Sequence, residues 1–314
     1  DNGTQLTKGV DYDLSYENNV NVGKATVNIT FKGNYTGTRS VNFNIIAKAL
    51  SNDLVDISET TAQTYTGSEI TPTPTIKFGD VTLVKDKDYT LSYEDNVNAG
   101  KAKINVSFIG NYSGTATSSF DIIPDVLNQE KVSISETTVQ TYTGSAITPT
   151  PTIKYGDVTL VKDKDYNLTY TDNVNVGTAK INITFINNYS GTAESSFNII
   201  PDVLNQEKVS ISEIAKQTYT GKEITPAPTI KYGDVTLVKD KDYNLTYTDN
   251  VNVGTAKVSI AFIGNYSGTA STSFEITARV VAEDDKTIII QAIPNQTYTG
   301  SEIKPEPVII DKNR

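Results

Sequence analysis

Hydrophobic and polar residues alternate along most of this chain with a period of two. In the stretch TAKINITFIN, residues 178–187, Ala179, Ile181, Ile183 and Phe185 alternate with polar side chains. Strict alternation over five to eight residues is typical of a β-strand with one buried face and one solvated face. No segment has a convincing helical period. The pattern therefore predicts an all-β protein.

Other short segments of the same region follow the same pattern. Their apolar positions are Val132 and Ile134, then Tyr166, Leu168 and Tyr170, then Phe197 and Ile199. The stretch TIKYGDVTL, residues 152–160, predicts a hairpin with Gly156 and Asp157 at its turn.

The strand pattern belongs to a tandem repeat. The pair Asp-Tyr begins at Asp11, Asp88, Asp165 and Asp242, each 77 residues after the one before, and 151–180 is identical to 228–257. Such a fixed period is the signature of an array. Each repeat should hold six or seven short strands, which predicts small antiparallel immunoglobulin-like β-sandwiches.

The register of the repeats predicts the domain boundaries. Three complete repeats are expected at 48–124, 125–201 and 202–278. Residues 1–47 correspond to the later part of a repeat, and residues 279–314 to the early part of one. The simplest explanation is a window cut from a longer array. The alternative hypothesis is that the end of one chain completes the start of another, giving head-to-tail filaments.

The aromatic residues fall at fixed positions of the repeat. We interpret the 18 Tyr and nine Phe as core residues, and an exposed tyrosine platform for sugars is the alternative.

The hexapeptide GNYSGT at 110–115 returns in each repeat and could be a glycan acceptor, a ligand loop or a turn. We interpret it as a turn, with Gly110 and Gly114 at positive φ and Asn111 capping it. Tyr112 is expected to fold onto the core as a tyrosine corner, its hydroxyl bonded to backbone. Asn187 replaces the first Gly in one copy and should tolerate positive φ.

Composition excludes several classes of function. The net charge is −10 and the chain has no Cys and no His. A nucleic-acid partner would require a basic face, which the negative charge argues against. Without Cys and His, thiol nucleophiles, imidazole bases and the usual zinc sites are excluded. No apolar run reaches the length of a membrane span. With neither an initiating Met nor a signal peptide, we expect a mature fragment or an internal window of something longer.

The repeat resembles a known family. The stretches QTYTGSEITPTPTIKFGD, DYTLSYEDNVNAGKAKINVSFIGNYSGT and SSFDII, at 63–80, 88–115 and 118–123, resemble the tandem immunoglobulin-like repeats of Gram-positive surface proteins. The likeness covers essentially the whole chain. It implies a stalk or scaffold of a cell-wall-associated adhesin, and it supplies no catalytic residues. No sortase signal is present, so anchoring rests on the resemblance alone.

The densest charged cluster is KDKDY, where Asp163 and Asp165 lie two residues apart, with Asp172 further on. A solvated charged edge is the favoured interpretation, because Lys162 and Lys164 flank the acids, and a calcium site is the alternative. A glycosidase needs two acids across a cleft, which small sandwiches do not offer.

A Lys-Asn isopeptide bond is a further option for a stalk. It needs a buried Lys, whereas Lys154 and Lys180 alternate out of the apolar face. The sequence therefore designates no catalytic, cofactor-binding or metal-binding residue, and no cofactor.

The junctions between complete repeats contain no Gly. Pro124 and Pro201 should stiffen the exit of each repeat, with Val126 and Leu127 packing between neighbours. A semi-rigid rod is expected.

These observations predict a non-enzymatic stalk on the bacterial cell surface, extracellular and attached to the cell wall, which projects a binding domain. The alternative is a repeated adhesin module that itself binds a glycan or host protein. Expected partners are the neighbouring repeats, a second copy bound head to tail, and a host glycan or protein held through regions outside this chain. Neither nucleic acid nor a membrane span is expected.

Overall fold

The computed structural model describes residues 3–312. The chain divides into two compact units. The first holds the residues up to 133 together with 153–167 and 183–193, and the second holds 134–152, 168–182 and the residues from 194 onward. The division falls inside the range 125–201, whose strands contribute residues to both units.

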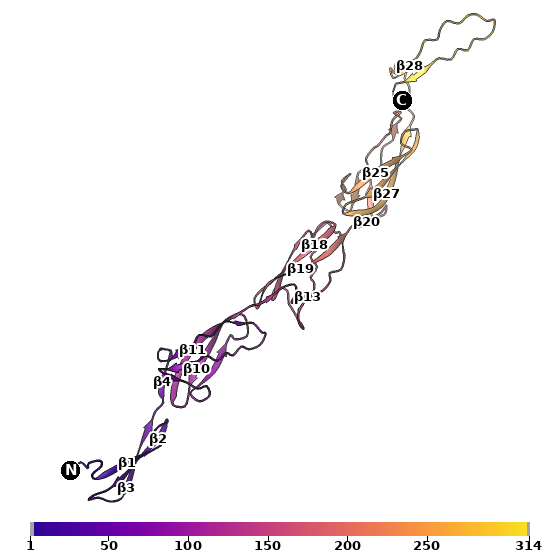
Figure 1. The fold of residues 1–314 in the computed structure, drawn as a ribbon. Helices are drawn as coiled ribbons and strands as arrows, with labels where there is room; N and C mark the ends of the chain where they lie inside the picture. The colour runs from indigo at the N-terminus through magenta and orange to yellow at the C-terminus, as the bar shows by residue number, and fades with distance from the viewer. Residues whose placement is uncertain (1–2, 313–314) are drawn as a thin grey trace. The chain divides into compact units, whose positions relative to one another are not determined.

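The first unit begins with a three-stranded antiparallel sheet (Figure 1), formed by β1 (Tyr12–Glu17), β2 (Gly23–Phe31) and β3 (Thr38–Ile45). Its apolar face is largely uncovered, because Val41 is 54% exposed and Phe43 is 42% exposed.

The residues 48–124 of the first unit form two facing sheets. The larger sheet has the order β4-β11-β10-β9, and β6 also pairs with β11. The smaller sheet has the order β5-β7-β8. The bounds are β4 (Lys48–Leu50), β5 (Asp56–Ile57), β6 (Gln63–Thr64), β7 (Ile76–Phe78), β8 (Val81–Thr82), β9 (Tyr89–Glu94), β10 (Gly100–Phe108) and β11 (Tyr112–Ile123), with one short 3-10 helix, η1 (Asn52–Leu54).

The apolar face of the larger sheet is covered by two different segments. Over one end, Val106 and Phe108 pack with Ile76 of the smaller sheet. Over the other end, Ala102, Ile104, Phe120 and Ile122 pack against Tyr65 and Ile70, which belong to an irregular segment. Each such repeat therefore has two adjoining clusters of core residues along a single sheet.

The irregular segment is fixed by two polar side chains. The Tyr93 hydroxyl donates a hydrogen bond of 2.8 Å to the carbonyl of Pro72. Asn96 is buried. Its side-chain Nδ2 donates to the Ile70 carbonyl at 3.1 Å, and its main-chain carbonyl accepts from the Ile70 N–H. These bonds satisfy backbone groups that have no sheet partner, which allows a proline-rich stretch to close a core.

The second unit contains the same arrangement within 202–278. Its larger sheet has the order β20-β27-β26-β25, with β22 also on β27, and its smaller sheet has the order β21-β23-β24. The bounds are β20 (Asp202–Leu204), β21 (Val209–Ile211), β22 (Gln217–Thr218), β23 (Ile230–Tyr232), β24 (Val235–Thr236), β25 (Tyr243–Thr248), β26 (Gly254–Phe262) and β27 (Tyr266–Thr277).

The strands of 125–201 follow the same sequence of elements. They are β12 (Asp125–Leu127), β13 (Val132–Ile134), β14 (Gln140–Thr141), β15 (Ile153–Tyr155), β16 (Val158–Thr159), β17 (Tyr166–Thr171), β18 (Gly177–Phe185) and β19 (Tyr189–Ile200). The hairpin predicted at Gly156 and Asp157 is confirmed by the pairing of Tyr155 with Val158.

The second unit ends in a hairpin of β28 (Ile288–Ile290) and β29 (Ile309–Asp311). Arg279 lies 3.5 Å from Asp285 and 3.6 Å from Asp311 at this hairpin. Its apolar side chains are open to solvent; Ile290 and Ile309, for example, are 65% and 61% exposed.

The predicted all-β class and the tandem β-sandwich repeats are confirmed. Two details differ from the expectation. Residues 48–124 carry eight strands instead of the expected six or seven, and three of them, β5, β6 and β8, are only two residues long. The larger sheet is not purely antiparallel, since β4 and β6 both join β11 in parallel register. Within 3–312 no helix is long and apolar enough to cross a membrane.

The parallel pairing of β4 with β11 depends on a glycine. Gly114 has φ +97, and a Cβ built on it would lie 2.3 Å from the carbonyl oxygen of Leu50. Gly191 and Gly268 are placed in the same way, with the Leu127 and Leu204 oxygens at 2.2 Å. Because the second glycine of the hexapeptide has no Cβ, the first strand of the repeat can lie directly beside the strand that follows the turn.

We expect Gly114→Ala to destabilise the repeat 48–124 by about 2–4 kcal/mol, since it adds both a left-handed strain and a backbone clash. The matched control is Gly79→Ala, at φ +58 with open space around it, which should cost only about 1–2 kcal/mol. Urea unfolding followed by circular dichroism measures both. Equal losses would show that the close approach to Leu50 does not matter.

Candidate functional site

The asparagine of the hexapeptide joins consecutive repeats. In the first unit, Asn188 Oδ1 accepts a hydrogen bond of 2.8 Å from the Ala99 N–H, and Asn188 Nδ2 donates at 3.0 Å to Asn98 Oδ1. The loop 95–99 connects β9 to β10 of the preceding repeat. Because the Ala99 N–H can only donate, it fixes the orientation of the Asn188 amide.

The same pair of bonds occurs at two other junctions. In the first unit, Asn111 accepts from the Val22 N–H at 2.8 Å and donates to Asn21 at 2.9 Å. In the second unit, Asn265 accepts from the Val176 N–H and donates to Asn175, both at 2.9 Å. We call this pair of hydrogen bonds the asparagine clamp.

The clamp corrects the predicted role of this asparagine. The hexapeptide is a turn, with Gly110 at φ +70 and Gly114 at φ +97, and Asn187 tolerates φ +60 as expected. However, the Asn111 side chain does not cap its own turn and instead contacts the preceding repeat. The amide nitrogen that a glycan would occupy at Asn111 is already a hydrogen-bond donor.

An aromatic contact accompanies the clamp. Tyr189 follows Asn188 and is 8% exposed. Its ring meets Tyr65 of the preceding repeat edge to face at 5.5 Å, and Tyr155 of its own repeat at 6.1 Å. Burial, followed by the influence of Tyr65, raises the pKa of the Tyr189 hydroxyl to about 12. The corresponding Tyr266 meets Tyr142 at 5.4 Å, and burial likewise raises its pKa to about 12.

The predicted tyrosine corner is assigned to the wrong residue. Tyr112 packs on the core as expected, edge to face with Phe78. The hydroxyl that bonds to backbone belongs instead to Tyr93, and in the same way to Tyr170 and Tyr247.

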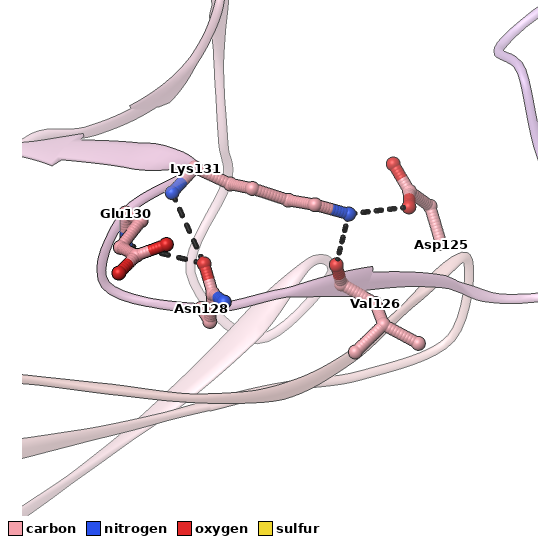
Figure 2. Close-up of polar contacts among 5 residues, drawn as sticks. All are labelled: Asp125, Val126, Asn128, Glu130 and Lys131. Carbon is pink, nitrogen blue, oxygen red and sulfur yellow. Dashed lines mark hydrogen bonds and ion pairs between the residues drawn. The ribbon is translucent and has the colours of Figure 1, made fainter.

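The start of the repeats 125–201 and 202–278 is fixed by a lysine and an asparagine, which Figure 2 shows for the first of the two. Lys131 Nζ lies 3.3 Å from Asp125 Oδ1 and donates at 2.6 Å to the Val126 carbonyl. Asn128 Oδ1 accepts from the N–H groups of Glu130 and Lys131, both at 3.1 Å. Asp125 also accepts from the Tyr155 hydroxyl, which raises the pKa of that tyrosine.

Only Pro124 separates β11 from β12. The expectation that Val126 and Leu127 pack between neighbours is wrong in part. Leu127 is fully buried, but it pairs with β19 of its own repeat, as Leu50 pairs with β11. Val126 is 60% exposed.

The acidic cluster divides into two environments. Asp163 is exposed at φ +65, as a solvated edge requires. Asp165 contradicts that interpretation, because it is 9% exposed and its Oδ2 accepts from the Val161 N–H at 2.8 Å. Asp172 lies at φ +57 at the start of a junction loop. In the described part of the chain, His, Cys, Asp and Glu side chains form no group of three suited to a metal ion.

The remaining candidate chemistry is not assembled into a site. Lys154 and Lys180 are both exposed, so neither has the buried surroundings that an isopeptide bond needs. A shallow concavity of about 540 Å³ lies on the polar face of β26 and β27, where Lys257 and Ser259 contribute to its lining.

The comparisons with known proteins give little further information. No family model matches the chain, and no curated protein matches it. Similar solved structures include protocadherin gammaB7 EC3-6 in a cis-dimer (10% identity, 86% of this chain and 94% of that chain, TM-score 0.22). Others are the protocadherin gammaB4 extracellular domain (10%, 99% and 67%, 0.21) and the human desmocollin-1 ectodomain (9%, 91% and 72%, 0.17). At these TM-scores the likeness supports no functional conclusion.

We expect Asn188→Ala to lose both clamp bonds and leave the Ala99 N–H without its partner. The free energy that couples the two neighbouring repeats should fall by about 1–3 kcal/mol. The control is Asn167→Ala, an exposed asparagine on β17. Urea unfolding should show a broader, less cooperative transition for Asn188→Ala alone. An unchanged transition would mean that the clamp contributes nothing to stability.

The buried tyrosines predict a loss of stability in alkali. A phenol in an unfolded chain ionises near pH 10, whereas Tyr189 and Tyr266 hold their protons to about 12. The unfolded state therefore releases these protons first, so stability is complete below about pH 10 and falls as the pH rises toward 12. Urea midpoints across this range should fall less steeply for the double variant Tyr189→Phe, Tyr266→Phe. Parallel curves would contradict the assignment.

Proposed function

We propose that this chain is a non-enzymatic structural segment, a spacer built of tandem β-sandwiches that projects a binding domain from a bacterial cell wall. The observation that supports it most directly is the asparagine clamp. Three junctions use the same two hydrogen bonds, and one proline connects the flanking strands at two of them. A spacer has to transmit its orientation from repeat to repeat, and such junctions restrict bending more than a Gly/Ser tether would.

The proposed units of this spacer are the repeats 48–124, 125–201 and 202–278, flanked by the partial repeats 1–47 and 279–314. The sheet β1-β2-β3 and the hairpin β28-β29 both leave apolar faces open. We propose that these two faces associate head to tail between copies, since open strand edges and half-covered cores favour a partner. An extracellular location at the cell surface fits this proposal.

The rival function is a repeated adhesin module that binds a glycan or a host protein. Its candidate platform is weakened by the placement of the tyrosines, because Tyr189 and Tyr266 are buried at junctions and cannot stack on a sugar. Among residues 3–312, exposed tyrosines lie only in the outer segments, such as Tyr16 and Tyr298 at 47% and 88% exposure.

A glycan array probed with the 314-residue chain distinguishes the two functions. The spacer proposal expects no reproducible binding, and micromolar binding by each repeat would overturn it. Small-angle X-ray scattering tests the mechanical half of the proposal, which expects a distance distribution with a long tail. A compact profile would contradict a spacer.

A further inference from the structure

In the three complete repeats, the first strand lies beside the last strand and runs in the same direction. In the second unit, β20 pairs with β27 in parallel register, from Asp202 opposite Tyr266 to Leu204 opposite Gly268. In the same way β4 pairs with β11, and β12 pairs with β19. The chain therefore enters and leaves such a repeat through neighbouring strands of one sheet.

A second parallel pairing lies further along the same last strand. The short strand β22 pairs in parallel with the end of β27, at 276–277. The Tyr219 N–H continues this pairing with a hydrogen bond of 2.9 Å to the Thr277 carbonyl, and the Thr277 hydroxyl donates at 3.1 Å to the Gln217 carbonyl. The pairs β6 with β11 and β14 with β19 repeat the arrangement. The last strand is thus held near both of its ends by segments that precede it in the chain.

This topology determines how a pull on the two ends of a repeat acts on its hydrogen bonds. Force enters β20 at its start and leaves β27 at its end, so the two parallel strands are pulled in opposite directions along their axes. The hydrogen bonds of the ladder run between the strands and not along them. All bonds of the pairing therefore share the force, whereas strands that are separated from one end lose their bonds one by one.

The first strand is also anchored in the core. Leu204 is fully buried and belongs to the same cluster as Tyr266. Its carbonyl oxygen would lie 2.2 Å from a Cβ on Gly268, so the two backbones are in close contact. A slip of β20 along β27 by one residue would turn Leu204 out of this cluster, because side chains alternate between the two faces. Leu50 and Leu127 are buried at the corresponding positions.

We propose that these repeats resist tension along the chain, and that the parallel pairing of the first and last strands is the element that provides this resistance. In 202–278 the pairing of β20 has to break as a whole before the core opens, and the pairing of β22 then resists in the same way. This function adds to the proposed spacer role and does not follow from it, since a spacer could keep its orientation without resisting a pull.

Single-molecule pulling of the full chain in two directions tests the proposal. The chain has no Cys, so two introduced cysteines define the points of attachment. Ile200→Cys with Ala278→Cys pulls 202–278 along its strands. Ile200→Cys with Asn244→Cys pulls the same repeat across its sheet, because the order β20-β27-β26-β25 places Asn244 on the opposite edge. All three side chains are exposed, so both double variants should keep the urea midpoint of the parent.

Lifetimes at one constant force measure the resistance, since forced opening is governed by the unfolding rate. We expect the repeat to open about tenfold more slowly, or slower still, when it is pulled along its strands. This factor needs only one or two hydrogen bonds more than must break together in the other direction. A smaller difference, or faster opening along the strands, would overturn the proposed resistance. That result would leave the spacer function standing, because the glycan array and the scattering experiment test it separately.

Discussion

The close approach of two backbones at the second glycine of the hexapeptide determines much of the rest of the structure. Because Gly114, Gly191 and Gly268 lack a Cβ, the first strand of a repeat can lie in parallel beside the strand that follows its closing turn. The entry and the closing turn of a repeat are thereby held at the same place. The first strand of a repeat follows the last strand of the preceding repeat after a single proline, Pro124 or Pro201. The closing turn, which lies beside that first strand, therefore also contacts the preceding repeat.

This placement explains why one short motif serves three purposes. Its glycines shape the turn, its tyrosine fills the core beside the entry strand, and its asparagine reaches the loop of the neighbour. The motif is local in sequence, but the bonds of its asparagine span 89 or 90 residues. A polar pair of this kind adds little net energy in water, and its value lies in orientation, since a mismatched neighbour would leave a backbone N–H unpaired.

Much of the fold could be predicted from the sequence, because strand alternation and a 77-residue period are local or repetitive signals. The hairpin at Gly156 and the positive φ of Asn187 follow directly from residue type. The parallel pairing of β4 and β6 with β11 could not be predicted, since alternation specifies which face is buried and not which strand is the neighbour.

The clamp was missed for a related physical reason. An asparagine between two glycines favours a turn whichever way its side chain points, so residue type alone led to a capping role for Asn111. The burial of Asp165 could not be predicted for a similar reason. Two flanking lysines favour a solvated acid, and only the turn in which the Val161 N–H donates to Asp165 shows that this carboxylate is buried. A usable signal was nevertheless present: Asn-Val-Asn and Asn-Tyr recur together four times at a fixed separation. Two polar motifs that recur in phase are what a repeated contact between neighbours requires.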